Sequence, residues 1–559
     1  MIKNVRGFIK MTILTLNRKE FEKSVGKVTK ELEDRITQMG TPVEEVTKDI
    51  VSVEVFPNRP DLLSLPNFAN SVNQFNGKKG IVKYNIKNPE KDYTVTIDKS
   101  VKKVRPHTVC AIVKNLKLDN EKIVQLIDVQ EKLHASLGRK RKKVAIGIYP
   151  LDKIALPIKF TAKKPEDIMF RPLESEKDMS AKQILKNHPA GIEYAHLLKN
   201  SEVFPLFVDA DNEILSMPPI INSEKTGRVN EKTKSVFIEC SGDNLHYLKK
   251  CLNILVQTFN GMGATIYSMN IKDATMKSFV SPDMSFEEMP FKISDIEKTL
   301  GISLSEKQVK SYLGRMGIGY LSKKGGSIAL IPPYRTDILH WIDLAEEVAI
   351  AYGYENFEPI IPEISTIAEE DKTEKTKRVI SNILAGAGLL ETSSFHLTTK
   401  KNIKKSHFDY KDFIEVAESK TAHNTLRMDL LTNLFEILSE NSDAAYPQKI
   451  FEMGRVFSLD KSGKTETGIA ERENLAIAMI DEKMNFTELK QVVDYLFKML
   501  DVEYTVEETD DSNYIAGRVG NIIVDGKKIG VIGEVSPRVI RNWKLKAAVS
   551  TLEINLGSF

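Results

Sequence analysis

The stretch PNRPDLL at residues 57–63 recurs in similar form as PYRTDIL at residues 333–339. An offset of 276 residues relates six identical pairs in the two segments, namely Pro57/Pro333, Arg59/Arg335, Asp61/Asp337, Ala69/Ala345, Val72/Val348 and Gly77/Gly353. Each copy reads as two short helices, strands and a closing helix. A duplicated helical module of about 70 to 80 residues is the simplest explanation, and chance similarity is the alternative.

The closing helix of the second copy carries an unusual cluster of acids. Asp343, Glu346 and Glu347 stand where the first copy has Asn67, Asn70 and Ser71. Residues 338–352 have apolar side chains at helical spacing, so the three acids share one helix face. Like charges at this spacing repel, and a solvated face usually mixes signs.

We therefore expect a cation near this helix. For the group of four that includes Asp337, a hard, oxygen-preferring ion such as Mg²⁺ and a merely acidic helix face are equally good interpretations. For Asp337 alone, a helix N-cap is the favoured interpretation, and Asp61 would cap the first copy in the same way.

Composition restricts the class of protein. The chain has 559 residues, 41% hydrophobic and 28% charged, with a net charge of +3, which is typical of a soluble protein of several domains. No apolar run approaches the roughly 20 residues of a membrane span. Thr12 and Thr15 interrupt the opening apolar stretch, so a secretory signal is not expected, and Met11 is a candidate start. Three cysteines without a CxxC indicate neither disulfides nor zinc, so a cytoplasmic location is expected.

The region between the copies has mixed strand and helix patterns. Strands are expected at residues 104–113, 144–149, 204–208, 214–217 and 235–240, and a helix at 245–260. MPPIIN at residues 217–222 is incompatible with a central strand, because its prolines remove hydrogen-bond donors. Ser216 and Glu239 then face a cleft in one interpretation. In the other they belong to an ordinary proline-rich turn and the protein surface.

One basic run suggests contact with phosphates. Arg139, Lys140, Arg141, Lys142 and Lys143 follow Gly138 and precede the strand VAIGIY. Five consecutive basic residues suit a nucleic acid, but such a run is also typical of a solvated turn. Common phosphate-binding loops, hydrolase elbows and the HExxH metal motif are absent from the sequence.

The last 190 or so residues alternate helices with strands. Residues 359–378 read as a charged linker or an exposed helix start, residues 379–389 and 426–440 as helices, and residues 448–457 as a strand. Strands are also expected at 521–524, 527–534 and 547–554. Asp525-Gly526 is a two-residue hairpin signal, because both turn positions need positive φ.

These residues together resemble the beta subunit of phenylalanine-tRNA ligase, of the shorter archaeal and eukaryotic type. The most specific segments are FPNRPDLLSL, GRKRKKVAIGIY, SMPPIIN, PPYRTDILHWIDLAEEVAIAYGYENF, LRMDLLTNL, KIFEMGRVF and IGVIGEVSPRVIRNW, which occur in the family's order over essentially the whole chain.

The resemblance implies a multidomain α+β fold. Residues 1–85 would be a helical module of nucleic-acid-binding type, 86–282 an α/β editing domain, 283–358 the second module, and 359–559 a class II synthetase-like antiparallel domain without catalysis. FEMGRVF lacks the arginine that precedes the glutamate in active class II enzymes, and a motif-three segment is missing. No aminoacylation residues are therefore expected on this chain.

The resemblance also implies ligands and partners. Asp337, Asp343, Glu346 and Glu347 match the Mg²⁺ positions near the alpha subunit. Phe207, Ser216, Glu239 and Ser241 match the pocket that hydrolyses tyrosyl-tRNA(Phe), although Ser241 stands where threonine is more usual. Expected partners are tRNA(Phe) and the alpha subunit, in a heterotetramer of two alpha and two beta chains, with ATP and phenylalanine bound through alpha. A membrane is not among them.

Two other classes of function remain open at this point. The chain is alternatively a stand-alone RNA-binding or scaffold paralogue that lost catalysis, or a free-standing editing hydrolase. The intact acid cluster and the presence of both ends of the synthetase-like C-terminal fold favour a ligase subunit.

Overall fold

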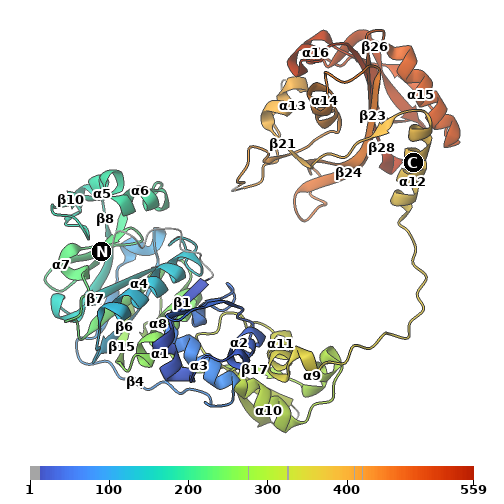
Figure 1. Cartoon of the computed structure of the whole chain (residues 1–559). Coiled ribbons are helices and arrows are strands. Elements are labelled where there is room, and N and C mark those ends of the chain that lie inside the picture. The colour runs from blue at the N-terminus through green and yellow to red at the C-terminus, as the bar shows by residue number, and fades with distance from the viewer. Residues whose placement is uncertain (1–12, 275, 324–325, 408–409, 418, 559) are drawn as a thin grey trace. The chain divides into compact units, whose positions relative to one another are not determined.

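The computed structural model describes residues 13–274, 276–323, 326–407, 410–417 and 419–558, so the opening segment considered above as a signal lies outside it. The chain forms two compact units, Met1–Ile360 and Ile361–Phe559, which are described separately (Figure 1). No helix in the described ranges has both the length and the apolar character that a membrane span requires.

The two copies of the repeat have the same element order. The first contains β1 (Ile13–Asn17), α1 (Arg18–Val25), α2 (Lys30–Gln38), β2 (Val43–Val46), β3 (Ile50–Glu54) and α3 (Leu65–Phe75). The second contains β17 (Glu287–Phe291), α9 (Ile293–Leu300), α10 (Glu306–Arg315), β18 (Gly319–Lys323), β19 (Gly326–Ile331) and α11 (Trp341–Tyr352). Each forms a three-stranded antiparallel sheet with its third strand in the middle, in the orders β1-β3-β2 and β17-β19-β18.

The repeated motif forms the same ion pair in both copies. The Arg59 guanidinium donates two hydrogen bonds of 3.0 and 2.9 Å to Asp61. The Arg335 guanidinium donates two hydrogen bonds of 2.8 Å to Asp337. The two motifs also touch, since the Thr336 hydroxyl donates to the Asn58 carbonyl at 3.1 Å. Each motif therefore fixes its own loop and the contact between the modules.

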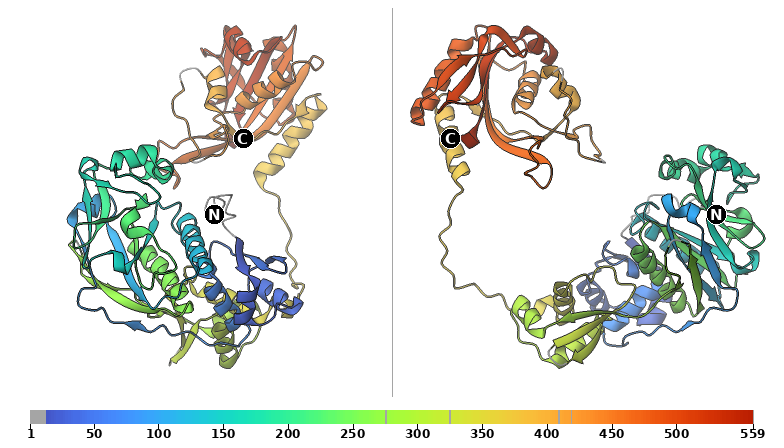
Figure 2. Two further views of the ribbon diagram at one scale, coloured as in Figure 1. Left: turned by 60° about the vertical axis from the view of Figure 1, so that its left-hand side comes forward. Right: turned by 180° about the vertical axis from the view of Figure 1, so that it is seen from behind.

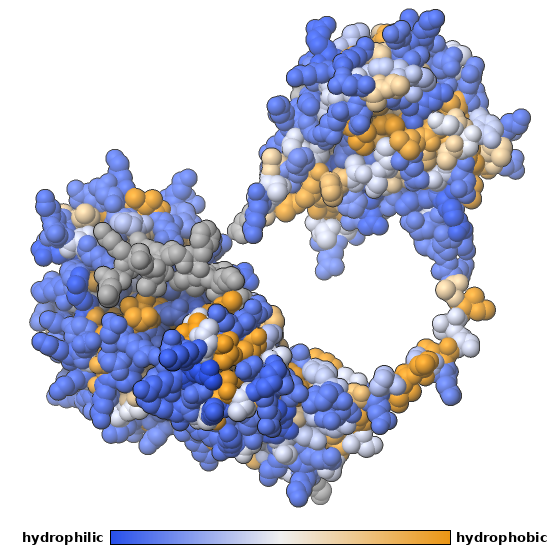
Figure 3. Space-filling model, viewed as in Figure 1, coloured by the Kyte–Doolittle hydropathy of each residue, from blue (hydrophilic) through white to orange (hydrophobic). Residues whose placement is uncertain are grey.

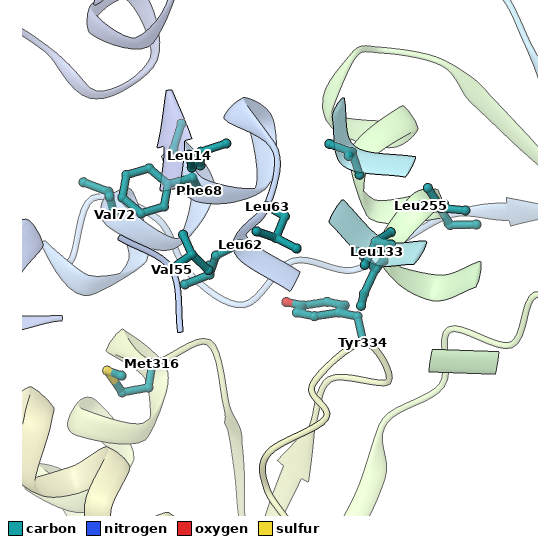
Figure 4. Close-up of a cluster of buried hydrophobic side chains, with 14 of the residues drawn as sticks. Leu14, Val55, Leu62, Leu63, Phe68, Val72, Leu133, Leu255, Met316 and Tyr334 are labelled. Atoms are coloured by element: carbon teal, nitrogen blue, oxygen red, sulfur yellow. The ribbon is translucent and has the colours of Figure 1, made fainter. Parts of the chain in front are cut away.

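A shared apolar core continues this contact. Tyr334 of the second copy packs in one cluster with Leu62 and Leu63 of the first copy and with Leu133 and Leu255 (Figure 4). The two modules and the middle region thus form one unit, and the predicted boundaries inside it stay predictions.

The middle region is built on an eleven-stranded mixed sheet. Its main path is β13-β12-β11-β8-β5-β15-β6-β14-β7, and β4 and β16 pair with β15. The strands are β4 (Ile86–Lys87), β5 (Thr94–Ile97), β6 (His107–Lys114), β7 (Val144–Pro150), β8 (Ile158–Lys163), β11 (Phe204–Val208), β12 (Ile214–Met217), β13 (Ile221–Asn222), β14 (Val236–Gly242), β15 (Thr265–Asp273) and β16 (Phe279–Ser281). Two of the region's helices, α4 (Asn120–Ala135) and α8 (Leu245–Gly261), pack with β6, β7 and β14 (Figure 1).

Alternation along β14 divides that sheet into two faces. Ile238 and Cys240 belong to the core shared with α4 and α8, whereas Phe237 belongs to a separate aromatic layer with Tyr149 and Phe160. Glu239 and Ser241 follow the phase of Phe237, because side chains alternate along a strand. Both therefore lie on the face that α4 and α8 do not cover.

The second unit is a seven-stranded, mainly antiparallel sheet with helices on both faces (Figure 2). The strand order is β20-β23-β24-β28-β27-β26-β25, comprising β20 (Leu390–Glu391), β23 (Gln448–Leu459), β24 (Ile469–Asp481), β25 (Thr505–Glu508), β26 (Tyr514–Val524), β27 (Lys527–Val535) and β28 (Ala548–Asn555). Helices α12 (Lys372–Gly386) and α15 (Phe486–Met499) pack on one face. Helices α14 (Leu431–Glu440) and α16 (Pro537–Trp543) pack on the other.

The predicted multidomain α+β class is confirmed at this coarse level, because two compact units combine helices with antiparallel and mixed sheets. The Asp525-Gly526 hairpin is confirmed, with φ values of 49° and 72° between β26 and β27. The helix predicted at 379–389 begins earlier, because the Asp371 side chain caps the Thr373 amide and starts α12 at Lys372. Within the described chain, the stretch from 357 to 371 contains no helix or strand.

Candidate functional site

A group of buried polar side chains lies beside the aromatic layer, away from α4 and α8. It comprises Arg105, Tyr149, Ser216, Glu239 and Ser241, each at most 4% exposed, and is called the buried polar cluster below. Strand pairing brings Tyr149 of β7 beside Glu239 and Ser241 of β14. Ser216 comes from β12, which pairs with β11 and β13, and Arg105 precedes β6. Most of the cluster thus comes from strands far apart in sequence.

The Tyr149 hydroxyl is the centre of this cluster. It lies 2.7 Å from Ser216 Oγ, 3.3 Å from Glu239 Oε1 and 3.4 Å from Asn222 Oδ1. Burial beside Glu239 raises the pKa of Tyr149 well above its ordinary value, so the phenol stays protonated. Three side chains therefore surround one neutral phenol hydroxyl.

Burial also decides the charge of the acid and the base. It raises the pKa of Glu239 to about 8, although Arg105 opposes this shift, so the carboxyl is mostly neutral at pH 7. Burial lowers the pKa of Arg105 to about 10, which leaves its guanidinium charged. Among the described residues, Glu239 Oε2 has no hydrogen-bond partner. The cluster thus has one buried cation and one neutral carboxyl with an unused oxygen.

The four predicted pocket residues occupy different positions around Tyr149. Ser216 and Glu239 both contact it directly, whereas Ser241 Oγ accepts from Arg105 Nε at 3.0 Å. Phe207 is the cross-strand neighbour of Ser216, and its ring stacks on Phe160 with centroids 4.4 Å apart. Tyr149 and Arg105 are not predicted from the sequence.

A glycine in β7 was the signal that could have identified Tyr149. A Cβ atom at Gly147 would lie 2.2 Å from the Tyr149 hydroxyl oxygen and 2.6 Å from Glu239 Oε1. A glycine inside an apolar strand often marks close approach by another group, and here that group is the phenol–carboxyl contact. For Arg105 the sequence has no comparable signal.

The acids of the second copy are arranged around Arg335. Its guanidinium binds Asp337 and also contacts both oxygens of Glu347, at 3.0 and 2.8 Å. Arg335 keeps the pKa of Asp337 below its ordinary value against the effect of burial. The cation expected near this helix is therefore an arginine for two of the four acids.

The other two acids have different environments. Asp343 accepts from the Leu339 and His340 amides at 2.7 Å each, and His340 is the N-cap of α11. The predicted capping role of Asp337 is thus wrong, because its carboxylate is occupied by Arg335 and the helix begins four residues later. The Glu346 side chain is largely exposed. Its pKa is raised by the partial desolvation of its carboxyl group and by the nearby negative charges of Glu347 and Asp343.

These positions fit a metal ion only in part. The donors are carboxylate oxygens, which suit Mg²⁺. Within the described ranges, however, no three His, Cys, Asp or Glu side chains converge as a metal site requires. As arranged, the four acids do not form a four-carboxylate site, because Arg335 forms ion pairs with Asp337 and Glu347 and leaves Asp343 and Glu346 as the two remaining carboxylates.

The basic run is divided between structural and exposed side chains. Arg141 donates to the Ile220 carbonyl at 3.0 Å and pairs with Glu131 at 3.1 Å, and Lys143 lies over the Tyr247 ring at 4.9 Å. Arg139, Lys140 and Lys142 are exposed. Those three remain the candidates for contact with phosphates.

In the second unit, the glutamate of FEMGRVF is fully engaged. Arg427 Nη1 donates to Glu452 Oε1 at 2.6 Å, and the Ser394 hydroxyl donates to Oε2 at 2.7 Å. Both Arg427 and Glu452 are 2% exposed. This carboxylate therefore stabilises the domain interior and does not face solvent.

Comparison with known proteins assigns both ends of the described chain. The family model "tRNA synthetase B5 domain" matches residues 289–354, and "Phenylalanyl tRNA synthetase beta chain CLM domain" matches residues 358–556. A solved N-terminal fragment of the phenylalanyl-tRNA synthetase beta subunit from Pyrococcus horikoshii is 33% identical with a TM-score of 0.58, covering 61% of this chain and 99% of the fragment.

Curated relatives extend the similarity over most of the sequence. The phenylalanine–tRNA ligase beta subunit of Thermococcus sibiricus is 38% identical over 510 residues, covering 90% of this chain and 89% of the relative. The beta subunit from Archaeoglobus fulgidus is 34% identical over 556 residues, covering 98% of this chain and 99% of its own length. With both matched family models, this similarity shows that the chain belongs to the family of phenylalanine–tRNA ligase beta subunits.

Proposed function

We propose that the chain supports ATP-dependent attachment of phenylalanine to tRNA(Phe) by an alpha subunit, in an assembly of two alpha and two beta chains. ATP and phenylalanine bind on alpha. The missing arginine before the glutamate of FEMGRVF supports this division of labour, and the glutamate itself, Glu452, is already paired with Arg427 inside the domain. A cytoplasmic location stays a prediction.

We further propose that the middle region hydrolyses tyrosyl-tRNA(Phe). The observation that supports this proposal is a phenol hydroxyl, that of Tyr149, which lies between Ser216 and Glu239 in the buried polar cluster. A site that hydrogen-bonds a hydroxyl leaves buried groups unpaired when phenylalanine enters, and so rejects it. In this proposal the substrate phenol takes the place of the Tyr149 hydroxyl.

The reaction needs no nucleophilic side chain in this proposal. Histidine is not among the hydrogen-bond partners of Ser216 among the described residues, so an activated serine is not invoked. A positioned water attacks the ester carbonyl, and the ester oxygen leaves with the tRNA. Ser216 and the neutral Glu239 recognise the phenol and orient the aminoacyl group.

The test is deacylation of tyrosyl-tRNA(Phe) by the chain together with alpha. Glu239→Ala is expected to slow deacylation by about tenfold or more, since about 1.4 kcal/mol of lost recognition is a tenfold change. Tyr149→Ala is expected to accelerate it, because the internal phenol no longer competes. Phenylalanylation is the control and stays unchanged in both variants.

Two results would count against this proposal. Equal deacylation by Glu239→Ala and the parent removes Glu239 from the pocket. No deacylation by the parent or by Tyr149→Ala, with normal charging of phenylalanine, leaves a subunit that serves assembly and tRNA binding only. This second result favours the scaffold alternative for the middle region.

Mg²⁺ is proposed to bind at α11 through Asp343 and Glu346. One or two carboxylates with retained waters are a common arrangement for this ion. Glu346→Gln is expected to weaken Mg²⁺ binding, measured by calorimetry, without unfolding the chain, whereas Glu347 is unsuitable for this test because Arg335 depends on it. Equal Mg²⁺ affinity in Glu346→Gln and the parent would remove this residue from the site.

Contact with tRNA is proposed at Arg139, Lys140 and Lys142. These side chains are exposed at one turn, and neutralised phosphates make affinity fall with salt. Replacing all three with Gln is expected to weaken tRNA(Phe) binding and to flatten its salt dependence.

A further inference from the structure

Arg105 is a buried cation without a counter-ion in the chain. Three arginines of the described residues are buried, namely Arg105, Arg335 and Arg427, with 4%, 2% and 2% of their surface exposed. Arg335 and Arg427 each form an ion pair with an aspartate or a glutamate. Arg105 differs, because every acceptor that it has in the described part of the chain is an uncharged oxygen. A buried charge is costly unless it is paired, so Arg105 indicates an anion that the chain itself does not supply.

One nitrogen of the Arg105 guanidinium remains available to such an anion. Nε donates to Ser241 Oγ at 3.0 Å, and Nη2 donates to the carbonyl oxygens of Ser241 and Arg141. Nη1 has no acceptor among the described residues, and it does not belong to the fully enclosed unpaired atoms. The contacts therefore fix the guanidinium and leave one of its donor groups for a ligand.

The carboxylates around Arg105 leave its positive charge in place. Glu239 is mostly neutral at pH 7, because burial raises its pKa to about 8. Asp243 is exposed to solvent, and Glu131 is already paired with Arg141 at 3.1 Å. The end of the buried polar cluster at Arg105 is therefore positive.

The basic turn that begins at Arg139 lies against this guanidinium. Arg139, Lys140 and Arg141 have φ values of 45°, 53° and 64°, in the left-handed region that side chains other than glycine rarely adopt. The Arg141 side chain holds this shape by donating to the Ile220 carbonyl at 3.0 Å. Strained turns of this kind persist where surrounding contacts hold them, and they are typical of ligand sites. The exposed Arg139 and Lys140 thus belong to the same turn whose carbonyl accepts from Arg105.

We propose that Arg105 and the basic turn bind a phosphate group of the RNA strand that enters the buried polar cluster. Arginine suits phosphate, because hydrogen bonds between the two are charge-assisted. Ser241, which Arg105 contacts, lies two residues after Glu239 on β14, a separation of about 6.6 Å along a strand. A phosphate at Arg105 is therefore close to an aminoacyl group held at Glu239. This inference rests on the proposed hydrolysis of tyrosyl-tRNA(Phe), and it adds a buried residue to the proposed tRNA contact.

The experiment titrates the full chain with the RNA trinucleotide CCA and with inorganic phosphate, by calorimetry at several salt concentrations. Arg105→Gln is expected to weaken CCA binding by about tenfold or more, because a charge-assisted hydrogen bond is lost. The slope of log affinity against log salt concentration should become shallower by about 0.7, the value for one phosphate of a single strand. Arg105→Lys keeps the charge and is expected to keep the slope of the parent.

Arg171→Gln is the matched control. Arg171 is exposed and has a carboxylate of its own, that of Asp178 at 3.2 Å, so CCA affinity should not change. Ser241→Asp covers the case in which Arg105→Gln fails to fold, because it places an internal carboxylate beside Arg105. This variant is expected to keep the circular dichroism of the parent and to lose about tenfold in CCA affinity.

The outcomes separate this inference from the proposed hydrolysis. Inorganic phosphate is expected to compete with CCA, and binding of inorganic phosphate without binding of CCA would overturn the assignment to RNA. No binding of either probe at millimolar concentration, or equal CCA affinity in the parent and in folded Arg105→Gln or Ser241→Asp, would overturn the proposal as a whole. A chain that binds CCA through Arg105 but leaves tyrosyl-tRNA(Phe) intact would support this inference and refute the proposed hydrolysis alone.

Discussion

At the scale of single residues, Glu239 links the candidate pocket to stability. Its pKa of about 8 in the folded chain lies above the ordinary value of 4.5, because burial disfavours the charged form. A group whose pKa is raised on folding stabilises the protein fully at low pH, and that stabilisation disappears as pH rises through the folded pKa. The first unit is therefore expected to lose stability between pH 4.5 and pH 8.

The slope approaches about 1.4 kcal/mol per pH unit for one proton. Urea unfolding at several pH values measures it, with Trp341 as the fluorescent reporter in a Trp543→Phe background, since these two are the only tryptophans of the sequence. Glu239→Gln keeps the shape of the side chain but removes its titrating carboxyl group. This variant is expected to lose most of the pH dependence of the free energy of unfolding. An identical slope in this variant would mean that other groups dominate.

Arg335 shows how one buried cation organises several acids. Arg335→Met would leave Asp337 and Glu347 without their partner, and removing one member of a buried ion pair typically costs about 3–5 kcal/mol. The same Trp341 titration measures this loss. Arg335→Met combined with Glu347→Leu is expected to recover a large part of the lost free energy of unfolding. A double variant no more stable than Arg335→Met alone would contradict the pairing.

At the scale of elements, the hairpin between β26 and β27 depends on its turn. Gly526 has φ 72°, where a side chain costs about 1–2 kcal/mol, so Gly526→Ala is expected to destabilise the second unit by about that amount. Asp525→Asn is the control, because asparagine tolerates the same backbone conformation. Trp543 fluorescence in a Trp341→Phe background follows the transition, and equal stability of Gly526→Ala and the parent would contradict the expectation.

Elements were predictable where one local signal decides them. The repeat, the hairpin and the strands that meet in the polar cluster all follow from short patterns in the sequence. The start of α11 was not predictable. It depends on whether the Asp337 carboxylate caps the helix or pairs with Arg335, and both interpretations fit the same residues. The contacts of Glu239 and Ser241 were hidden as well, because Tyr149 meets Glu239 only through the pairing of β7 with β14, and Arg105, which precedes β6, donates to Ser241 from a distant segment.

At the scale of the whole molecule, the segment between the units exposes apolar side chains. Ile360, Ile361, Ile364 and Ile367 are 72% exposed or more, and Figure 3 shows hydrophobic side chains along this connection. An exposed apolar stretch of this kind is typical of an interaction site. Under the proposed function, the alpha subunit covers it.

Limited proteolysis tests this idea. A glutamate-specific protease is expected to cut first at Glu363, Glu369 or Glu370, because the stretch from 357 to 371 has no helix or strand to resist it. Two stable fragments should result, since each compact unit has its own apolar core. Replacing these three glutamates with Gln should remove the first cut. Bound alpha subunit should slow cleavage in the parent, and an equal rate with and without alpha would show that the isoleucines stay uncovered in the assembly, so that subunit contact must rest on other surfaces.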